Sequence, residues 1–253
     1  MINIALTLEY DGSNYHGWQL QSNAPTVQGA LLKAMEKVLG ERPQVCVSGR
    51  TDAGVHALGQ VVNFKVNTRL RPDELQRALN TNLPRDIAIK RAENVPCDFH
   101  AQYSAAAKAY KYVILNRASP SPLLARYSWH VRHPLDVSAM REGARHLMGT
   151  HDFRAFWGRV SSSPRTPVRT IEELTVSQWG DTIEIRVQAD GFLRYMVRNI
   201  TGTLVEGGKG KIPPSRVKGI LDSKDRTQAG PTAPPQGLFL VEVLYRTVDG
   251  GPK

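Results

Sequence analysis

Short strand-like segments alternate with helix-like segments along this chain, and this alternation limits the possible folds more than any other feature. Residues 2–10 alternate apolar and polar side chains, which is typical of a strand with one face in a core. Residues 26–40 carry apolar side chains at helical spacing, between a threonine suited to cap a helix and a glycine suited to end one. The order of elements reads approximately β-α-β-β-α-β, twice, which predicts an α+β protein with mainly antiparallel sheets.

The same patterns predict the remaining elements and a division into two similar lobes. Strands are expected at residues 45–47, 60–66, 87–90, 108–115 and 237–245, with a hairpin over residues 174–187. Helices are expected at residues 72–79, 136–149, 193–208 and 217–221. We place the boundary near residue 105, which gives an N-terminal α+β lobe over residues 1–105 and a C-terminal α+β lobe over residues 106–253.

The chain is strongly basic. It has 253 residues, of which 33 are basic and 23 are acidic, and its formal net charge is +10. This excess indicates a polyanionic partner, with nucleic acid ahead of a membrane surface, and solubility alone is the alternative. No apolar run approaches the roughly 20 residues of a membrane span, and no signal sequence opens the chain, so we expect a cytoplasmic protein. Cys46 and Cys97 lack the spacing of a zinc site, so no bound metal is expected.

The sequence GRTDAGVH at residues 49–56 places one carboxylate, Asp52, in a glycine-flanked segment of this basic protein. A carboxylate repels a polyanion, so its display at a turn invites a chemical explanation. Residues two apart in an extended segment point to the same side, so Arg50 is expected to face Asp52 and favour the ionised form that a nucleophile needs. The structural alternative is an aspartate that bonds the backbone of its own turn.

This segment and four others resemble, in the same order, the motifs of the TruA-type tRNA pseudouridine synthases. The other segments are YDGSNYHGWQLQ at residues 10–21, FHAQYSA at 99–105 followed by YKY at 110–112, FLRYMVRNI at 192–200 and APPQGL at 233–238. Several spaced motifs in one order are far more specific than any single motif. The resemblance implies the pseudouridine synthase fold, with two lobes that meet at a central RNA-binding cleft.

The resemblance also implies an activity and the residues that perform it. We expect an isomerase that converts uridine to pseudouridine at positions 38, 39 and 40 of the tRNA anticodon stem-loop, without a cofactor. By the same resemblance Asp52 is the nucleophile, and Tyr110 packs against the target uracil. Arg50 helps to hold the target nucleotide out of the RNA stack, and Arg198 pairs with the catalytic carboxylate. The family likeness further implies a homodimer whose partner is tRNA and not a membrane.

Two of these residues also have plain structural readings, and the chain departs from the family at two positions. Tyr110 alternates along a predicted strand, where a core tyrosine is the ordinary occupant. Arg198 lies four residues after Arg194, so the two would repel on one helix face unless an anion or a carboxylate lies between them. The departures are Gln102 and Lys108, where arginine is common, and Gln102 lacks the bidentate donor that a phosphate contact would use.

Other segments carry weaker signals. GGKGK at residues 207–211 lacks the lysine and hydroxyl positions of a Walker phosphate loop and indicates a helix end. Residues 161–169 form a predicted basic loop that we expect to hold the phosphate backbone. Two other functions stay open. One is a non-catalytic tRNA-binding protein or RNA-folding chaperone, for which Asp52 would serve no purpose. The other is a glycosidase-like hydrolase, for which no second carboxylate is evident.

Overall fold

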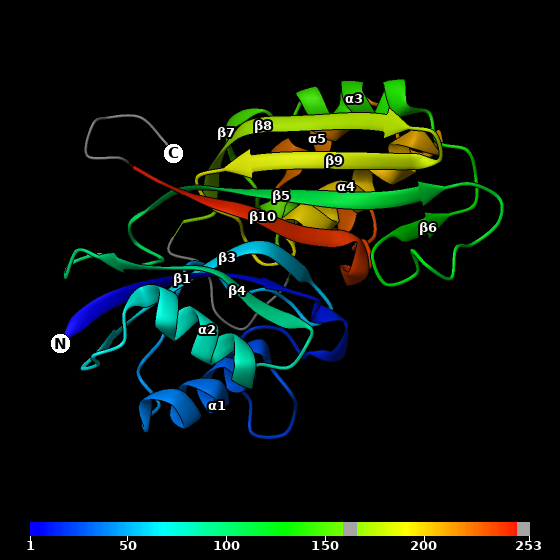
Figure 1. Ribbon diagram of the computed structural model, residues 1–253. Helices are drawn as coiled ribbons and strands as arrows, with labels where there is room; N and C mark the ends of the chain where they lie inside the picture. Colours follow the sequence, from blue (N-terminus) through cyan, green and yellow to red (C-terminus); the bar gives the residue numbers. More distant parts are fainter. Residues whose placement is uncertain (159–165, 247–253) are drawn as a thin grey trace. The chain divides into compact units, whose positions relative to one another are not determined.

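The described part of the chain combines helices with mainly antiparallel strands, as the α+β prediction required. The computed structural model describes residues 1–158 and 166–246, and in these residues it has five α-helices and ten strands (Figure 1). The chain divides into two units by its contacts. The first comprises Met1–Ala106 and the C-terminal segment that begins at Phe239, and the second comprises Ala107–Leu238.

The first unit places two helices beside a sheet. Its elements are β1 (Ile2–Tyr10), α1 (Val27–Leu39), β2 (Cys46–Val47), β3 (His56–Val66), α2 (Pro72–Asn82), β4 (Ile87–Val95) and β10 (Leu238–Tyr245). The strands follow the order β4-β1-β3-β10, and β2 also pairs with β3. The β1–β3, β1–β4 and β2–β3 pairs are antiparallel, whereas β10 pairs with β3 in parallel. Helices α1 and α2 pack together, and α2 packs against β4.

Helix α1 confirms its prediction in detail. The Thr26 hydroxyl accepts a hydrogen bond from the Gly29 backbone N–H at 3.1 Å, which caps the start of the helix. Gly40 ends the helix in the left-handed conformation, with a φ of 77°. The apolar stripe faces the core, because Leu31 and Met35 are fully buried.

The second unit is also built on an antiparallel sheet. Its elements are β5 (Ala105–Asn116), β6 (Trp129–Val131), α3 (Val137–Arg145), β7 (Gly149–Asp152), β8 (Val168–Trp179), β9 (Thr182–Ala189), α4 (Met196–Gly208) and α5 (Arg216–Ser223). The strands follow the order β5-β9-β8-β7, and β6 pairs in parallel with β5. Helix α3 packs against β8, α4 and α5. The predicted hairpin is confirmed, since β8 and β9 join through a turn after Trp179.

Helix α4 is the central helix of the second unit. All its residues except Arg198 and Glu206 are buried, which is typical of a helix covered on every side. A Cβ at Gly202 would lie 1.7 Å from the carbonyl oxygen of Pro231, so the segment around Pro231 runs directly over the helix backbone. Helix α4, which begins at Met196 and not at Leu193 as predicted, therefore holds the segment around Pro231 in place.

Three details of the second unit differ from the prediction. Helix α3 ends at Arg145 and not at Gly149, and Gly149, with a φ of 90°, begins strand β7. The sequence pattern did not predict β6 or β7, which are only three and four residues long. Pairing with β5 and β8 stabilises these two strands, and such tertiary contacts outweigh local propensity.

The end of the chain returns to the first unit. Phe239 and Leu240 of β10 pair with His56 and Ala57 of β3. The lobe boundary near residue 105 stays a prediction. The prediction did not include the return of the last strand to the first unit. Within the described residues, no helix combines the length and the apolar character that crossing a bilayer requires.

Candidate active site

The predicted nucleophile, Asp52, lies on the loop between β2 and β3, which we call the Asp52 loop (residues 48–55). Asp52 is half-buried, and Arg50 is exposed. Arg50 makes no ion pair or hydrogen bond with any described residue, so the expected pairing of Arg50 with Asp52 is not formed. The expectation assumed an extended strand, but residues 49–55 have no strand conformation, and the alternation of a strand does not apply to them.

The segment after β1 holds the backbone of the Asp52 loop. The Trp18 N–H donates a hydrogen bond to the Thr51 carbonyl at 3.1 Å, and the Gly54 N–H donates to the Tyr15 carbonyl at 3.2 Å. The first bond lies directly before Asp52 and the second lies two residues after it. The backbone that carries the carboxylate is therefore held on both sides.

Two glycines of the N-terminal motif allow this close approach. Gly17 has a φ of 88°, and a Cβ there would lie 2.6 Å from the Thr51 carbonyl oxygen. A Cβ at Gly12 would lie 2.0 Å from the Val55 carbonyl oxygen. Both distances are shorter than any real contact of a Cβ atom, so only glycine lets the two backbones pack in this way.

A buried polar network supports the Asp52 loop from the sheet side. The hydroxyls of Tyr10 and Thr51 share a hydrogen bond of 2.8 Å, and the Gln60 side-chain amide donates to the Gly49 carbonyl at 2.8 Å. The Ser48 hydroxyl in turn donates to the Gln60 side-chain oxygen at 2.6 Å. Burial raises the pKa of Tyr10 to about 12. These groups satisfy one another away from water, which makes the network rigid.

His56 joins the end of the Asp52 loop to the N-terminal motif. Its ring is buried and stacks on Phe239, with the ring centroids 4.7 Å apart. The Gly12 N–H donates to Nδ1 of His56 at 3.0 Å, and Oδ1 of Asp11 lies 3.1 Å from the same nitrogen. The bond from Gly12 needs an unprotonated Nδ1, whereas a bond to Asp11 needs a proton there. In both protonation states the ring therefore has a partner on the N-terminal segment.

Tyr110 lies on β5 in the second unit. It pairs across the sheet with Val187, and only 8% of its surface is exposed. Its ring meets Phe192 edge to face, at a centroid distance of 5.1 Å and an interplanar angle of 83°. This neighbour orients the ring, which suits both a core tyrosine and an aromatic surface for a base.

Arg198 lies on α4 and is tied to the closing motif. Its Nε donates to the Ala233 carbonyl at 2.7 Å, and the Ala233 N–H donates back to the Arg198 carbonyl at 3.1 Å. The guanidinium carbon of Arg198 lies 5.0 Å from the centre of the Tyr195 ring, and that of Arg194 lies 4.7 Å from it. Both cations thus interact with one aromatic ring, whereas the sequence pattern led us to expect an anion between them.

Sequence reasoning missed Asn199, the next residue on α4. Its side-chain amide donates to the Phe156 carbonyl at 2.8 Å, and its oxygen accepts from Thr232 at 2.6 Å and from Arg226 at 3.0 Å. Asn199 is fully buried, and these bonds link α4 to the 3-10 turns that contain Phe156 and Arg226 and to Thr232. A polar asparagine among the apolar residues of a predicted helix is the sequence signal that could have identified Asn199.

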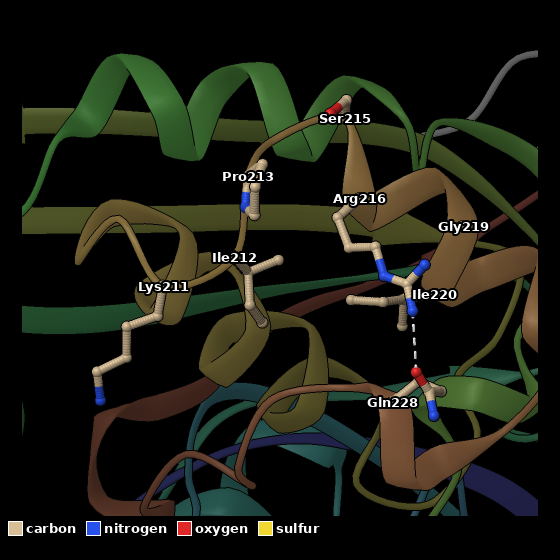
Figure 2. Close-up of a pocket in the computed structure, with 8 residues that line it drawn as sticks. All are labelled: Lys211, Ile212, Pro213, Ser215, Arg216, Gly219, Ile220 and Gln228. Carbon is tan, nitrogen blue, oxygen red and sulfur yellow. Dashed lines mark hydrogen bonds between the residues drawn. The ribbon is translucent and has the colours of Figure 1, made fainter.

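A cavity of about 640 Å³ lies beside α5 in the second unit and contains none of the predicted site residues. Figure 2 shows its lining, in which the Arg216 guanidinium donates to the Gln228 side chain at 3.0 Å. Lys211 adds a second cation to the lining. No three His, Cys, Asp or Glu side chains gather into a potential metal site in the part of the chain that the structure describes.

The four predicted site residues are distributed over both units. Arg50 and Asp52 belong to the first unit, and Tyr110 and Arg198 belong to the second. Their assignment to one site is a proposal that we develop below. Most of the predicted basic loop at residues 161–169 lies outside the described residues, which resume at Thr166.

The chain is similar to known proteins over nearly its full length. A family model described as tRNA pseudouridine synthase matches residues 7–104 and 144–246. The protein named tRNA pseudouridine synthase A from Thermoanaerobacter sp. (strain X514) is 51% identical over 245 residues, which cover 97% of this chain and 100% of that protein. The proteins of the same name from Moorella thermoacetica and Acetivibrio thermocellus are 47% and 46% identical, over 96% and 97% of this chain and 99% and 100% of their own lengths.

The buried Tyr10 hydroxyl leads to a prediction about alkaline stability. Because the pKa of Tyr10 rises from 10.0 to about 12 on folding, its contribution to stability is complete below pH 10 and is lost as the pH rises towards 12. We expect Tyr10→Phe to lower the free energy of unfolding by about 1–2 kcal/mol at neutral pH, because Thr51 loses its partner. Above pH 10 the variant should lose less stability than the wild type.

Urea unfolding on both sides of pH 10 checks this expectation. The control is Tyr103→Phe, because that tyrosine is 78% exposed and its loss should change neither the stability nor the alkaline slope. An identical alkaline slope for Tyr10→Phe and the wild type would contradict the network described here.

Proposed function

The chain belongs to the tRNA pseudouridine synthase family, and from this we propose that it isomerises uridine to pseudouridine in tRNA. The observation that carries the proposal is the identity of 51% with a protein named tRNA pseudouridine synthase A, over nearly the full length of both chains. The excess of basic residues suits a polyanionic substrate such as tRNA. We expect the protein to act in the cytoplasm, where tRNA is used.

The reaction defines what the site must do. The C1′–N1 bond of uridine breaks, the uracil turns, and a new bond joins C5 to C1′. The proton leaves C5, and N1 gains one, so the atoms balance without redox change or transfer of a group. The protein must therefore extrude the nucleotide, hold the detached base and supply a nucleophile.

Asp52 is the proposed nucleophile. Nucleophilic attack requires a carboxylate held in one position, and hydrogen bonds fix the backbone on both sides of Asp52. Such a support fixes the point from which the carboxylate projects, and a fixed position favours an effective catalytic group. A protein that only binds RNA would gain nothing from a negative charge at this point.

Tyr110, Arg50 and Arg198 have supporting roles in the proposal. The Tyr110 ring, oriented by Phe192, packs against the extruded uracil and replaces part of the stacking that the base loses. Arg50 is exposed, and its guanidinium takes part in holding the target nucleotide out of the RNA stack. Arg198, tied to Ala233 through Nε, pairs with the Asp52 carboxylate and keeps it ionised.

We further propose that the target uridines lie at positions 38, 39 and 40, in the anticodon stem-loop, and that the chain forms a homodimer. The support for both statements is the likeness of the five sequence motifs to the TruA-type enzymes. Mapping of pseudouridine in a tRNA treated with the protein tests the position. Modification confined to another arm of the tRNA would contradict it.

The first prediction from the proposed function concerns Asp52. Asp52→Ala should abolish formation of pseudouridine and leave the affinity for tRNA within roughly tenfold, because it removes the chemistry and also a charge that repels RNA. Nuclease digestion with chromatography of the nucleosides gives the turnover, and filter binding gives the affinity. The control is Asp222→Ala, an exposed aspartate that pairs with Lys218 on α5 and should change neither quantity. A collapse of affinity with Asp52→Ala would show a structural role.

The second prediction separates the ring of Tyr110 from its hydroxyl. Tyr110→Phe should keep most of the affinity for substrate tRNA, since the ring still packs against the base. Tyr110→Ala should weaken binding by about 1–3 kcal/mol, the usual worth of one stacked base. Equal affinities for the two variants would exclude the packing role.

The third prediction concerns the oligomeric state. Sedimentation equilibrium at micromolar protein should give twice the chain mass of 28.1 kDa. A particle with the mass of a single chain under these conditions would contradict the homodimer.

A further inference from the structure

Two cations lie on the face of the second sheet that carries Tyr110. Lys108 on β5 pairs with Ala189 on β9, and Ala189 pairs with Ile171 on β8. Directly paired residues project from the same face, and residues two apart on one strand share that face. Lys108 and Tyr110 therefore lie on one face of β5, and Arg169 lies on the same face of β8 as Ile171.

The segment after β9 connects the arginine to the tyrosine. A Cβ at Gly191 would lie 3.3 Å from Nε of Arg169, so the arginine side chain passes close over the backbone at Gly191. The next residue, Phe192, contacts the ring of Tyr110 at a centroid distance of 5.1 Å. Two consecutive residues thus link the two side chains: Gly191 lies beside Arg169, and Phe192 contacts the ring of Tyr110.

The ammonium of Lys108 has no anionic partner among the residues that the structure describes. It is half-buried, yet it makes no hydrogen bond or ion pair with any described residue. Burial, and then the charge of Arg169, hold the pKa of Lys108 below its usual range. The nearby carboxylate of Asp190 accepts a hydrogen bond from the Thr170 N–H at 3.0 Å and forms no ion pair with either cation.

Arg169 is held in place but keeps donors for a ligand. Its Nη1 donates to the carbonyls of Thr166 and Val168, at 2.9 Å and 2.5 Å. Its Nε and Nη2 make no hydrogen bond with the described residues. A guanidinium fixed by one nitrogen, with two more nitrogens to offer, is suited to an anion with several acceptor oxygens.

We propose that Lys108 and Arg169 bind one phosphate of the RNA backbone that flanks the uridine packed against Tyr110. Two half-buried cations that repel each other are costly without an anion, and a phosphodiester supplies one with oxygens for both. The inference rests on the proposed function of Tyr110, because the ring gives the position of the target base. The phosphate contact would fix the register of the RNA, so that one particular base reaches the ring.

The test compares Lys108→Gln and Arg169→Gln with a matched control. Lys111→Gln removes the same charge from the opposite face of β5, where Lys111 pairs with Arg186 and lies 4.0 Å from a carboxylate oxygen of Glu184. Filter binding of tRNA over a series of salt concentrations gives the affinity and its salt slope. Each test variant should bind tRNA about tenfold more weakly. The slope of log affinity against log salt concentration should fall by about one phosphate contact, whereas kcat is retained.

A second measurement locates the phosphate. A set of anticodon stem-loop RNAs, each with one neutral methylphosphonate linkage, is bound to the wild type and to Lys108→Gln. One linkage next to the target uridine should weaken binding to the wild type and leave binding to Lys108→Gln unchanged, because the contact is already lost. Lys108→Arg should restore the sensitivity to that linkage.

Three results would overturn the inference. The first is a Lys108→Gln variant that matches Lys111→Gln in affinity and slope. The second is a Lys108→Gln variant that loses kcat with unchanged affinity, since the lysine would then act on the chemistry and not on the RNA backbone. The third is a methylphosphonate effect of equal size in the wild type and the variant. Failure of the proposed function itself gives a different result, in which the wild type binds tRNA and forms no pseudouridine.

Discussion

The close packing of two backbones in the first unit determines where the proposed nucleophile lies. The segment after β1 approaches the Asp52 loop so closely that a Cβ at Gly12 or Gly17 would overlap its carbonyl oxygens. Hydrogen bonds from Trp18 to Thr51 and from Gly54 to Tyr15 then fix the loop on both sides of Asp52. These bonds hold the backbone that carries the carboxylate, so the N-terminal motif supports the proposed catalytic residue as well as ending a strand.

The second unit supplies a different kind of support. Helix α4 is buried on nearly all sides. The bond from Thr232 to Asn199 and the exchange of hydrogen bonds between Arg198 and Ala233 fasten the closing segment onto it. The sheet beside it presents Tyr110, with Phe192 against the edge of the ring. Base packing and phosphate contact can thus share one rigid face, on which Lys108 and Arg169 provide the charge. Rigid elements hold such groups more accurately than loops do.

Much of this arrangement could be predicted from the sequence, and the exceptions have physical causes. Helix α1 was predicted with both its caps, because Thr26 and Gly40 act through local bonds that the sequence alone determines. Strands β6 and β7 were missed, because pairing with distant strands stabilises them. The pairing of Arg50 with Asp52 was expected from strand geometry and is not formed, since the loop is not a strand. The shared interaction of Arg194 and Arg198 with the Tyr195 ring was not predicted, and the sequence pattern gives no sign that Tyr195 adopts the left-handed conformation.

Release of tritium from C5 of uridine tests the central claim most directly, because only a reaction that replaces the C5–H bond frees that label. Transcripts of tRNA labelled at C5 are incubated with the wild type and with Asp52→Asn, which keeps the shape of the side chain and removes its charge. Release by the wild type alone, in step with pseudouridine in the RNA, is the result the account predicts. Tight, salt-sensitive binding without release from any tRNA would contradict it and would indicate an RNA-binding protein that performs no isomerisation. Release of free uracil would instead indicate a hydrolase.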